Sequence, residues 1–389
     1  MMDRSRWSRR QFVRMAGCSS LGAMALGLPR LAPVSQASDK AAPRFAFISF
    51  DGKGANGAGI SVFDVRGAQW RQTSTVASQA PSSLVLDTGE NYLYVVNEIN
   101  EHEGLPSGTV EAYTIDAVDG RLRLLNRQRL SLSATAPRHA AVSPDGRALV
   151  VAVHGGGAYN VLPIREDGSL EEVVGILKET GSGLYEEQRS AHPQMVVFDP
   201  AGRVVSTDLG SDRLSVFNLN AARLSVSGRY EAQAGHGPRQ AVFHPDGRLL
   251  IVSNGLDASV ACYRYNADQG RIEKKLAQVA ISRGENTAGV LMAMDPAGKF
   301  LYTTHRSGVD GVSMWKINRD TGRMRRLQIV NVGVPQLNEI SVTSDGESLV
   351  GLSSEQSGVF VWRVANGQIA GGKRVANVEA PMSVAVKSS

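Results

Sequence analysis

Cysteine, aromatic residues and long apolar runs are scarce in this sequence, and each shortage excludes a class of protein. The chain has two cysteines, Cys18 and Cys262, which is too few for a disulfide framework. Beyond the N-terminus, no apolar run reaches the roughly 18 residues that a membrane-spanning helix needs. The sequence contains no Cys-x-x-Cys, His-Glu-x-x-His or Gly-x-Ser-x-Gly motif, so we predict no metal and no cofactor, and a serine hydrolase is disfavoured.

The N-terminus resembles a twin-arginine signal peptide. Residues 8–13 read Ser-Arg-Arg-Gln-Phe-Val, a mild apolar stretch covers 15–28, and small residues surround Ala37. We therefore expect residues 1–37 to be cleaved, 38–43 to form a linker, and the protein to reach the periplasm already folded. A disordered basic tail is the alternative. Cys18 resembles a lipoprotein site, but it precedes the apolar stretch instead of following it.

The positive formal charge of +5 belongs to this N-terminal segment. Removing residues 1–37 removes six arginines and one aspartate, which leaves 36 basic and 36 acidic side chains. A neutral chain without a concentrated basic surface is not typical of a nucleic-acid-binding protein. We expect neither a nucleic-acid partner nor stable membrane insertion after cleavage, and the oligomeric state stays open.

An internal repeat is the strongest signal in the remaining sequence. Six segments each consist of an apolar alternating run, a tight turn ending in glycine, and a second apolar run, which is typical of a β-hairpin. Proline or aspartate starts these turns, and glycine supplies the positive φ at their end. The six turns are Asp87–Gly89, Pro144–Gly146, Pro200–Gly202, Pro245–Gly247, Pro296–Gly298 and Ser344–Gly346.

Each repeat continues into a third and a fourth strand, and four strands in about 40–50 residues define a propeller blade. A seventh blade can be assembled from the two ends of the chain. Residues 45–76 read as three strands without an innermost one, and Pro381–Val386 supplies it. We thus predict an all-β fold over 44–389, a seven-bladed β-propeller of four-stranded antiparallel blades closed by N- and C-terminal strands in one blade. An open solenoid is the alternative, although it would leave both ends needing caps.

Polar residues at the starts of the first strands are expected to meet at one mouth of the central channel. These starts are Pro81-Ser82-Ser83, Pro137-Arg138-His139, His192-Pro193-Gln194, Pro238-Arg239-Gln240 and Pro335-Gln336-Leu337. The second strands return to the same end at Asn97-Glu98, His154 and His305-Arg306. Arginine can bind an anion or a developing oxyanion, and histidine can move a proton. The long segments 98–108 and 179–190 are expected to lie over one face.

Structural roles compete with these functional ones. Arg138 and Arg239 could pair with acidic residues for stability alone. His154 and His192 could serve as ordinary hydrogen-bonding residues, and the glycines 155–157 could form a simple turn.

Several stretches together resemble the seven-bladed propeller lactonases, which include propeller-type 6-phosphogluconolactonases and fungal carboxymuconate-cyclising enzymes. The resemblance covers the chain from Phe45 onward. The matching stretches are Tyr94–Glu98, Pro137–Gly146, His154–Gly157, Gln188-Arg189 before His192-Pro193, Asp208–Arg213 and Gly237-Pro238-Arg239 through Gly247.

The resemblance implies a site that contains His192, Arg239 and Arg306, which match the histidine and the two arginines of the family pattern. Three positions depart from it. Gln194 and Gln240 stand where the family has histidine, and Gly255 stands where it has glutamate.

We expect His192, Arg239 and Arg306 to be catalytic, and Arg138, His139, Glu98, His154, Gln194 and Gln240 to bind substrate. Glu98 and Glu339 are both candidates to replace the missing carboxylate. The expected partner is a small lactone or carboxylate, and the leading hypothesis is an exported lactone hydrolase. A carboxymuconate-type cycloisomerase and a non-enzymatic propeller that binds a small anion or a periplasmic partner are the alternatives.

Overall fold

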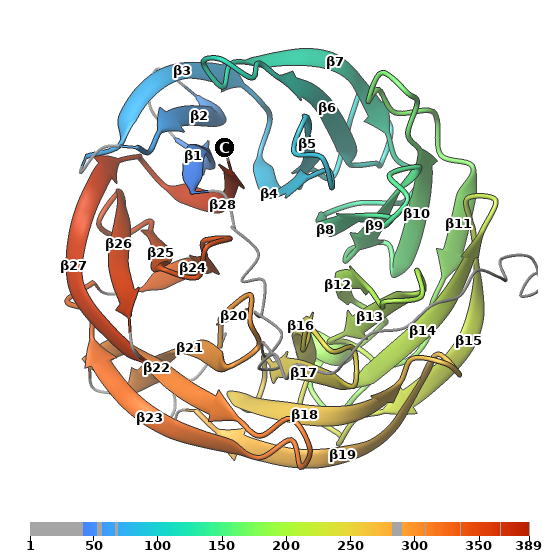
Figure 1. Ribbon diagram of the computed structural model, residues 1–389. Helices are drawn as coiled ribbons and strands as arrows, with labels where there is room; N and C mark the ends of the chain where they lie inside the picture. Colours follow the sequence, from blue (N-terminus) through green and yellow to red (C-terminus); the bar gives the residue numbers. More distant parts are fainter. Residues whose placement is uncertain are drawn as a thin grey trace, which may run out of the picture. The chain divides into compact units, whose positions relative to one another are not determined.

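A computed structural model describes residues 42–52, 57–66, 69–281, 290–307, 309–334, 336–365 and 367–388. Within these residues, 28 strands form seven four-stranded antiparallel sheets that surround a central channel (Figure 1). The all-β, seven-bladed prediction is therefore confirmed. The predicted signal peptide, residues 1–37, and most of the predicted linker lie outside the described residues.

The seven blades are numbered along the chain, and their strands are given from the channel outwards. Blade 1 consists of β28 (Pro381–Ser388), β1 (Pro43–Asp51), β2 (Ala58–Asp64) and β3 (Arg71–Ala77), and blade 2 of β4 (Pro81–Leu86), β5 (Tyr92–Asn97), β6 (Thr109–Ile115) and β7 (Leu122–Arg129). Blade 3 consists of β8 (Pro137–Val142), β9 (Ala148–Val153), β10 (Ala158–Pro163) and β11 (Gly175–Lys178), blade 4 of β12 (Pro193–Phe198), β13 (Val204–Asp208), β14 (Arg213–Asn220) and β15 (Arg223–Glu231), and blade 5 of β16 (Pro238–Phe243), β17 (Leu249–Asn254), β18 (Ser259–Asn266) and β19 (Arg271–Ala280). Blade 6 consists of β20 (Met292–Met294), β21 (Phe300–Ser307), β22 (Val309–Ile317) and β23 (Met324–Asn331), and blade 7 of β24 (Leu337–Val342), β25 (Ser348–Ser353), β26 (Gly358–Ala365) and β27 (Gln368–Asn377).

Blade 1 closes the ring in the predicted way. The C-terminal strand β28 pairs antiparallel with β1, with Ile48 opposite Val384 and Phe47 opposite Ala385. The inner strands β28, β4, β8, β12, β16, β20 and β24 contact one another in this circular order. Closure matters because every inner strand then has a neighbouring blade on both sides, and no inner blade face is left open to water.

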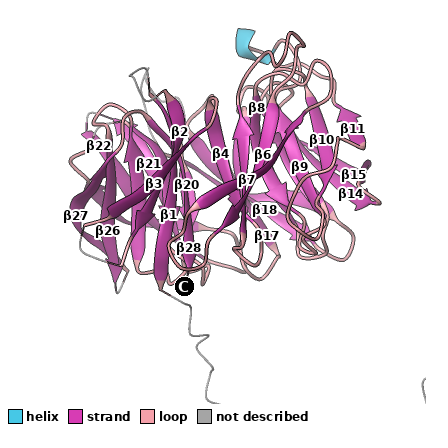
Figure 2. Ribbon diagram, turned by 90° about the horizontal axis from the view of Figure 1, so that it is seen from above, coloured by secondary structure: helices cyan, strands magenta, loops and turns pink. Residues whose placement is uncertain are grey.

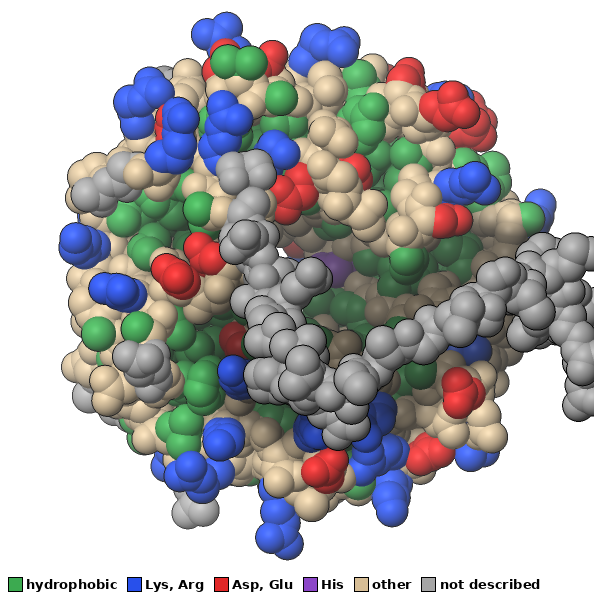
Figure 3. Space-filling model, in the orientation of Figure 1, with side chains coloured by type: hydrophobic (Ala, Val, Ile, Leu, Met, Phe, Trp, Pro, Cys, Tyr) green, Lys and Arg blue, Asp and Glu red, His purple; other side chains and the backbone are tan. Residues whose placement is uncertain are grey.

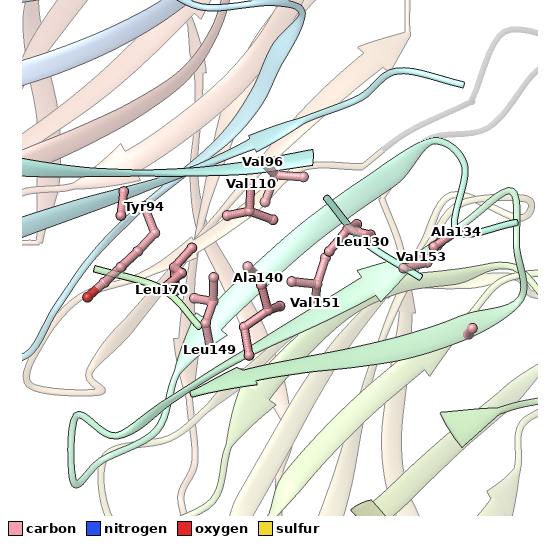
Figure 4. Packing of buried hydrophobic residues seen from close by; sticks show 13 residues of the cluster. Tyr94, Val96, Val110, Leu130, Ala134, Ala140, Leu149, Val151, Val153 and Leu170 are labelled. Atoms are coloured by element: carbon pink, nitrogen blue, oxygen red, sulfur yellow. The ribbon is translucent and has the colours of Figure 1, made fainter. Parts of the chain in front are cut away.

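The blades are held together by apolar side chains that pack between neighbouring sheets. Between blades 2 and 3, Tyr94 and Val110 of one sheet face Ala140, Leu149 and Val151 of the next (Figure 4). The middle strands are buried on both faces, so β9 reads as an uninterrupted apolar run instead of alternating. Full burial of one such aliphatic side chain contributes about 1.5–3 kcal/mol.

Most of the predicted glycine turns adopt the expected conformation, and one differs. Gly146, for example, has φ of 72° and its N–H donates to the carbonyl of Ser143 over 2.8 Å. In blade 2 the equivalent position is occupied by Glu90, with φ of 53°, and not by Gly89. Glu90 nevertheless fits, because its carboxylate accepts the N–H of Ser388 over 2.7 Å and so ties this turn to the closing strand.

The two long segments lie at the end of the channel where the inner strands begin, which is called the mouth below. Segment 98–108 is tied to the loop before β8 by a bridge between Ser107 and Ala134. Segment 179–190 contains the one-turn 3₁₀ helix η1 (Glu186–Gln188), which stands above the strands in Figure 2. Both segments thus lie at the mouth, segment 98–108 after β5 of blade 2 and segment 179–190 between β11 of blade 3 and β12 of blade 4.

The closing strand gives a test of the fold. Val384 of β28 is 7% exposed, whereas Val226 of β15 is 43% exposed. Val384→Asp should lower the free energy of unfolding by about 3 kcal/mol or more, because it buries an unpaired charge between blades 1 and 7. Val226→Asp is the matched control and should change it by less than about 0.5 kcal/mol. Urea unfolding followed by circular dichroism measures both; equal effects would contradict the proposed closure.

Candidate functional site

A bulge near the start of the inner strands determines which side chains line the channel. Side chains of a regular strand alternate between its two faces, so only every second residue would face inward. An inserted residue breaks this alternation and re-aims the side chains around it. In six inner strands the pairing register shifts at the second residue: Ser82, Arg138, Gln194, Arg239, Asn338 and Met382.

Because of this bulge, two successive residues of each of these strands line one cavity at the mouth. The cavity has a volume of about 290 Å³, and all seven blades contribute to its wall. Its polar lining consists of Ser82, Ser83, Glu98, Arg138, His139, Gln194, Arg239, Gln240, Asn338, Glu339 and Ser383. Figure 3 views the ring from the end opposite the mouth and shows an opening at its centre. The channel is therefore hollow and polar at this level.

Arg239 of blade 5 and Glu339 of blade 7 line the same cavity, and the charge of Arg239 acts on the Glu339 carboxyl group. The backbone of Arg239 is anchored by Thr207, whose Oγ1 donates to the Arg239 carbonyl over 2.7 Å. Burial raises the pKa of Glu339 to about 8, and the positive charge of Arg239 opposes this rise. Glu339 therefore carries its proton at neutral pH and can donate it.

His139 lies in the same wall, on blade 3. Burial lowers its pKa to about 4, so the ring is neutral at neutral pH. Within the described part of the chain, its Nδ1 is buried without a hydrogen-bond partner. A buried, unpaired ring nitrogen in a cavity wall is available to a ligand or a water molecule.

Arg138 and Glu98 form an ion pair at the rim, with 3.0 Å between Nη1 and Oε1. Glu98 directly follows β5, and its N–H donates to the carbonyl of Ala80 over 2.9 Å. Burial raises the pKa of Glu98, and the charge of Arg138 opposes the rise. The pairing that competed with a functional role for Arg138 is thus present, and both partners line the cavity.

Gln240 has a structural contact that its sequence did not reveal. Its Oε1 accepts the backbone N–H of Met292 over 2.8 Å and so joins blades 5 and 6. Gly255, where the family pattern has glutamate, lies against Arg239: a Cβ atom built on Gly255 would be 3.5 Å from the Arg239 Cδ.

His192 and His154 lie beside the cavity and do not line it. His192 immediately precedes β12, where its backbone N–H donates to Asp208 Oδ1 over 2.8 Å. The ring stacks on that of His154, with centroids 4.4 Å apart. Gln194, the second residue of β12, takes the cavity position and separates the pair from it.

The backbone of Arg306 belongs to β21 and pairs with Asp310, but its side chain lies outside the described residues. The expected strand start at Pro335-Gln336-Leu337 is displaced. β24 begins at Leu337, so Asn338 and Glu339 occupy the two lining positions.

Sequence reasoning missed Asn338 and Ser383 as lining residues. Both would have been found by aligning each inner strand on its second and third residues, since these positions line the cavity in six blades.

The fold and the cavity together define a class of protein: a seven-bladed propeller whose channel has, at one mouth, a pocket lined by arginine and by titratable side chains. Residues 47–388 match the family described as "Lactonase, 7-bladed beta-propeller". The chain belongs to this family.

Two curated relatives illustrate the membership. The chain is 28% identical over 254 residues to the 6-phosphogluconolactonase of Bacillus subtilis, which covers 64% of this chain and 70% of that protein. It is 25% identical over 339 residues to a protein of Arthroderma benhamiae named "Probable 6-phosphogluconolactonase", covering 83% and 84% of the two chains.

The fold is shared with the periplasmic gluconolactonase PpgL of Pseudomonas aeruginosa. The two structures superimpose with a TM-score of 0.78 at 23% identity, over 89% of this chain and 99% of that one.

Among the described residues, no helix is long and apolar enough to span a membrane. In the same part of the chain, no three histidine, cysteine, aspartate or glutamate residues are grouped so that they could hold a metal ion.

The raised pKa of Glu339 predicts a pH-dependent stability. Its folded-state pKa of about 8 lies above the roughly 4.3 of an unfolded glutamate, so its contribution is present at low pH and is lost as the pH rises toward 8. The free energy of unfolding should fall between about pH 6.5 and pH 8.5, where histidines no longer contribute. Glu339→Gln should flatten this fall, as measured by urea unfolding at each pH; an unchanged slope would contradict the assignment.

Proposed function

We propose that the protein hydrolyses a small sugar lactone of the gluconolactone type in the cavity at the mouth. One observation carries the proposal: a guanidinium (Arg239), a neutral imidazole (His139) and a protonated carboxyl (Glu339) line the same cavity. These are the groups that ring opening by water requires. The names of the two curated relatives support a lactone as the substrate.

Each group has a distinct part in the reaction. Arg239 binds the carbonyl oxygen of the lactone and stabilises the negative charge that develops on it. His139 accepts a proton from the attacking water, whose oxygen forms a bond to the carbonyl carbon. As the bond between that carbon and the ring oxygen breaks, Glu339 gives its proton to the departing oxygen. Transfer of the proton from His139 back to Glu339 restores the site and leaves the open-chain hydroxy acid.

The opposite pKa shifts support this division of labour. Burial disfavours charge, so it keeps the imidazole able to accept a proton and the carboxyl able to give one. In this proposal Glu339 supplies, from blade 7, the carboxyl group that the family pattern would place on blade 5 at the position of Gly255.

The N-terminal segment supports action outside the cytoplasm. Arg9 and Arg10, the apolar stretch and the small residues before residue 38 are typical of twin-arginine export. The fold that the chain shares with a periplasmic gluconolactonase is compatible with a location outside the cytoplasm. Because phosphorylated sugars are cytoplasmic metabolites, we infer that the substrate is an unphosphorylated lactone.

The first test is activity. Purified residues 38–389 should open D-glucono-1,5-lactone faster than buffer alone, and Arg239→Ala should lower kcat/KM by about 10²–10³-fold because the oxyanion loses its charged partner. Arg248→Ala is a matched control, since Arg248 pairs with Asp246 in the turn between β16 and β17 of the same blade and does not line the cavity. A pH-stat assay measures all three proteins.

Other outcomes would indicate the alternatives. Loss of muconate absorbance without lactone opening would favour a cycloisomerase. Ligand binding without turnover across a panel of lactones would favour a non-enzymatic propeller, and either result would contradict the proposal.

The second test is the pH profile. Activity requires neutral His139 and protonated Glu339, so kcat/KM should fall below about pH 4 and above about pH 8. Glu339→Gln cannot ionise, so its residual activity should lose the alkaline limb and keep the acidic one. An alkaline limb that persists in Glu339→Gln would assign it to a different group.

A further inference from the structure

Two imidazoles from neighbouring blades stack at the mouth beside the cavity. His154 follows β9 of blade 3, and His192 precedes β12 of blade 4. Their planes are inclined by 19°, with centroids 4.4 Å apart. Gln194 contacts both residues and lines the cavity, so it connects the stacked pair to the site.

Backbone carbonyls determine the protonation of both rings, because a carbonyl oxygen can only accept a hydrogen bond. His192 Nδ1 lies 3.0 Å from the carbonyl oxygen of His154, so Nδ1 carries a proton. In the neutral ring Nε2 then keeps its lone pair, and Ser190 Oγ lies 3.4 Å from it. Gln194 Nε2 lies 3.1 Å from the carbonyl oxygen of His192, which orients the amide with its NH₂ group on this side.

The oriented amide then determines the tautomer of His154. The same Nε2 of Gln194 lies 2.7 Å from His154 Nδ1 and donates its second hydrogen to it. His154 Nδ1 is therefore the acceptor, and the ring proton sits on Nε2. In their neutral forms the two stacked rings thus carry opposite tautomers, with an N–H at Nε2 of His154 and a lone pair at Nε2 of His192, which the Ser190 hydroxyl approaches at 3.4 Å.

Burial and the surrounding charges favour a neutral ring on His154. Burial lowers the pKa of His154 to about 4, and the positive charges of Arg138 and His192 act in the same direction. The negative charge of Glu98 is paired with Arg138. Asp208 faces His192, but its Oδ1 accepts the backbone N–H groups of His192 and Ser211 and not a ring nitrogen.

We propose that Gln194 is a positioning residue that locks His154 in its Nε2–H tautomer, that the His154 carbonyl holds the proton of His192 on Nδ1, and that the pair forms a subsite for sugar hydroxyl groups at the mouth. A hydroxyl group both donates and accepts, so a ring N–H beside a ring lone pair matches two hydroxyls of a polyol. A pair of imidazolium rings would offer two donors and a double positive charge instead, which suits a phosphate. The choice of ligand rests on the proposed function; the tautomers do not.

Nuclear magnetic resonance tests the lock directly. In the full chain labelled with ¹⁵N-histidine, seven histidines contribute signals, which His→Gln variants assign one by one. At pH 7 the shifts should identify His154 as the Nε2–H form and His192 as the Nδ1–H form. A cationic His154, or one protonated on Nδ1, would overturn the proposal.

Two variants of Gln194 sharpen this test. In Gln194→Glu the carboxylate can only accept, so the proton of His154 should move to Nδ1 and its pKa should rise. In Gln194→Ala the lock is removed, and the His154 signals should average between tautomers. Gln278→Ala is the matched control, since Gln278 approaches the Nδ1 of another histidine, His236, at 3.4 Å and neither lines the cavity.

Ligand binding tests the subsite separately from catalysis. D-glucono-1,5-lactam, a neutral analogue that is not hydrolysed, should shift the Nε2 signals of His154 and His192. Its Kd should rise about three- to tenfold in Gln194→Ala, the loss expected for one or two hydrogen bonds, and stay unchanged in Gln278→Ala. Should the protein open no lactone while the tautomers and the lactam effect persist, the proposed function fails and this subsite stands. Equal lactam affinity in the wild type and Gln194→Ala, without histidine shifts, would overturn the subsite.

Discussion

One extra residue near the start of the inner strands is the constraint on which the site depends. A regular strand would turn Arg138 toward the channel and His139 away from it, or the reverse. The bulge lets both reach the cavity, and the same holds for Arg239 with Gln240 and for Asn338 with Glu339. Since the bulge recurs in six blades, the mouth receives about twice as many side chains as simple alternation would supply. A cavity of about 290 Å³ can then hold a dense set of polar groups that no single blade could provide.

The low-dielectric interior of the ring acts on all of these groups in the same direction. It disfavours charge, so it lowers the pKa of His139 and His154 and raises that of Glu339. The arginines keep their charge because guanidinium does not deprotonate in proteins. The mouth therefore combines permanent cations with neutral proton donors and acceptors.

The fold could be predicted from sequence because its signals are local. Each hairpin has its own turn residues, and the incomplete repeat at the N-terminus together with an orphan strand at the C-terminus indicated how the ring closes. Glu90 shows the limit of this reasoning. Gly89, one residue earlier, was the obvious candidate for the positive φ. The contact between Glu90 and Ser388 explains why Glu90 takes this conformation instead.

The site was harder to predict because a bulge does not change the pattern of hydrophobic residues along the sequence. His192 was expected in the cavity, yet it stands one residue before the strand, and Gln194 takes the lining position. Glu339 was named only as a candidate, because counting from Pro335 placed Gln336 and Leu337 at the mouth. The hydrogen bond from Gln240 to blade 6 and the stacked histidines depend on distances between blades, which the sequence of one blade does not contain.

Closure of blade 1 by strands from both ends has a consequence for how the chain can be connected. The hydrogen bonds between β1 and β28 make this blade geometrically equivalent to the other six, although its strands come from opposite ends of the sequence. The ring of blades would therefore be the same if the chain began and ended at a different blade. A circular permutant, with residues 43 and 388 joined by a short linker and new ends opened in an exposed loop between two other blades, would retain every strand pair and the whole cavity wall. The order of the blades along the chain is in this sense arbitrary, whereas their order around the channel is not.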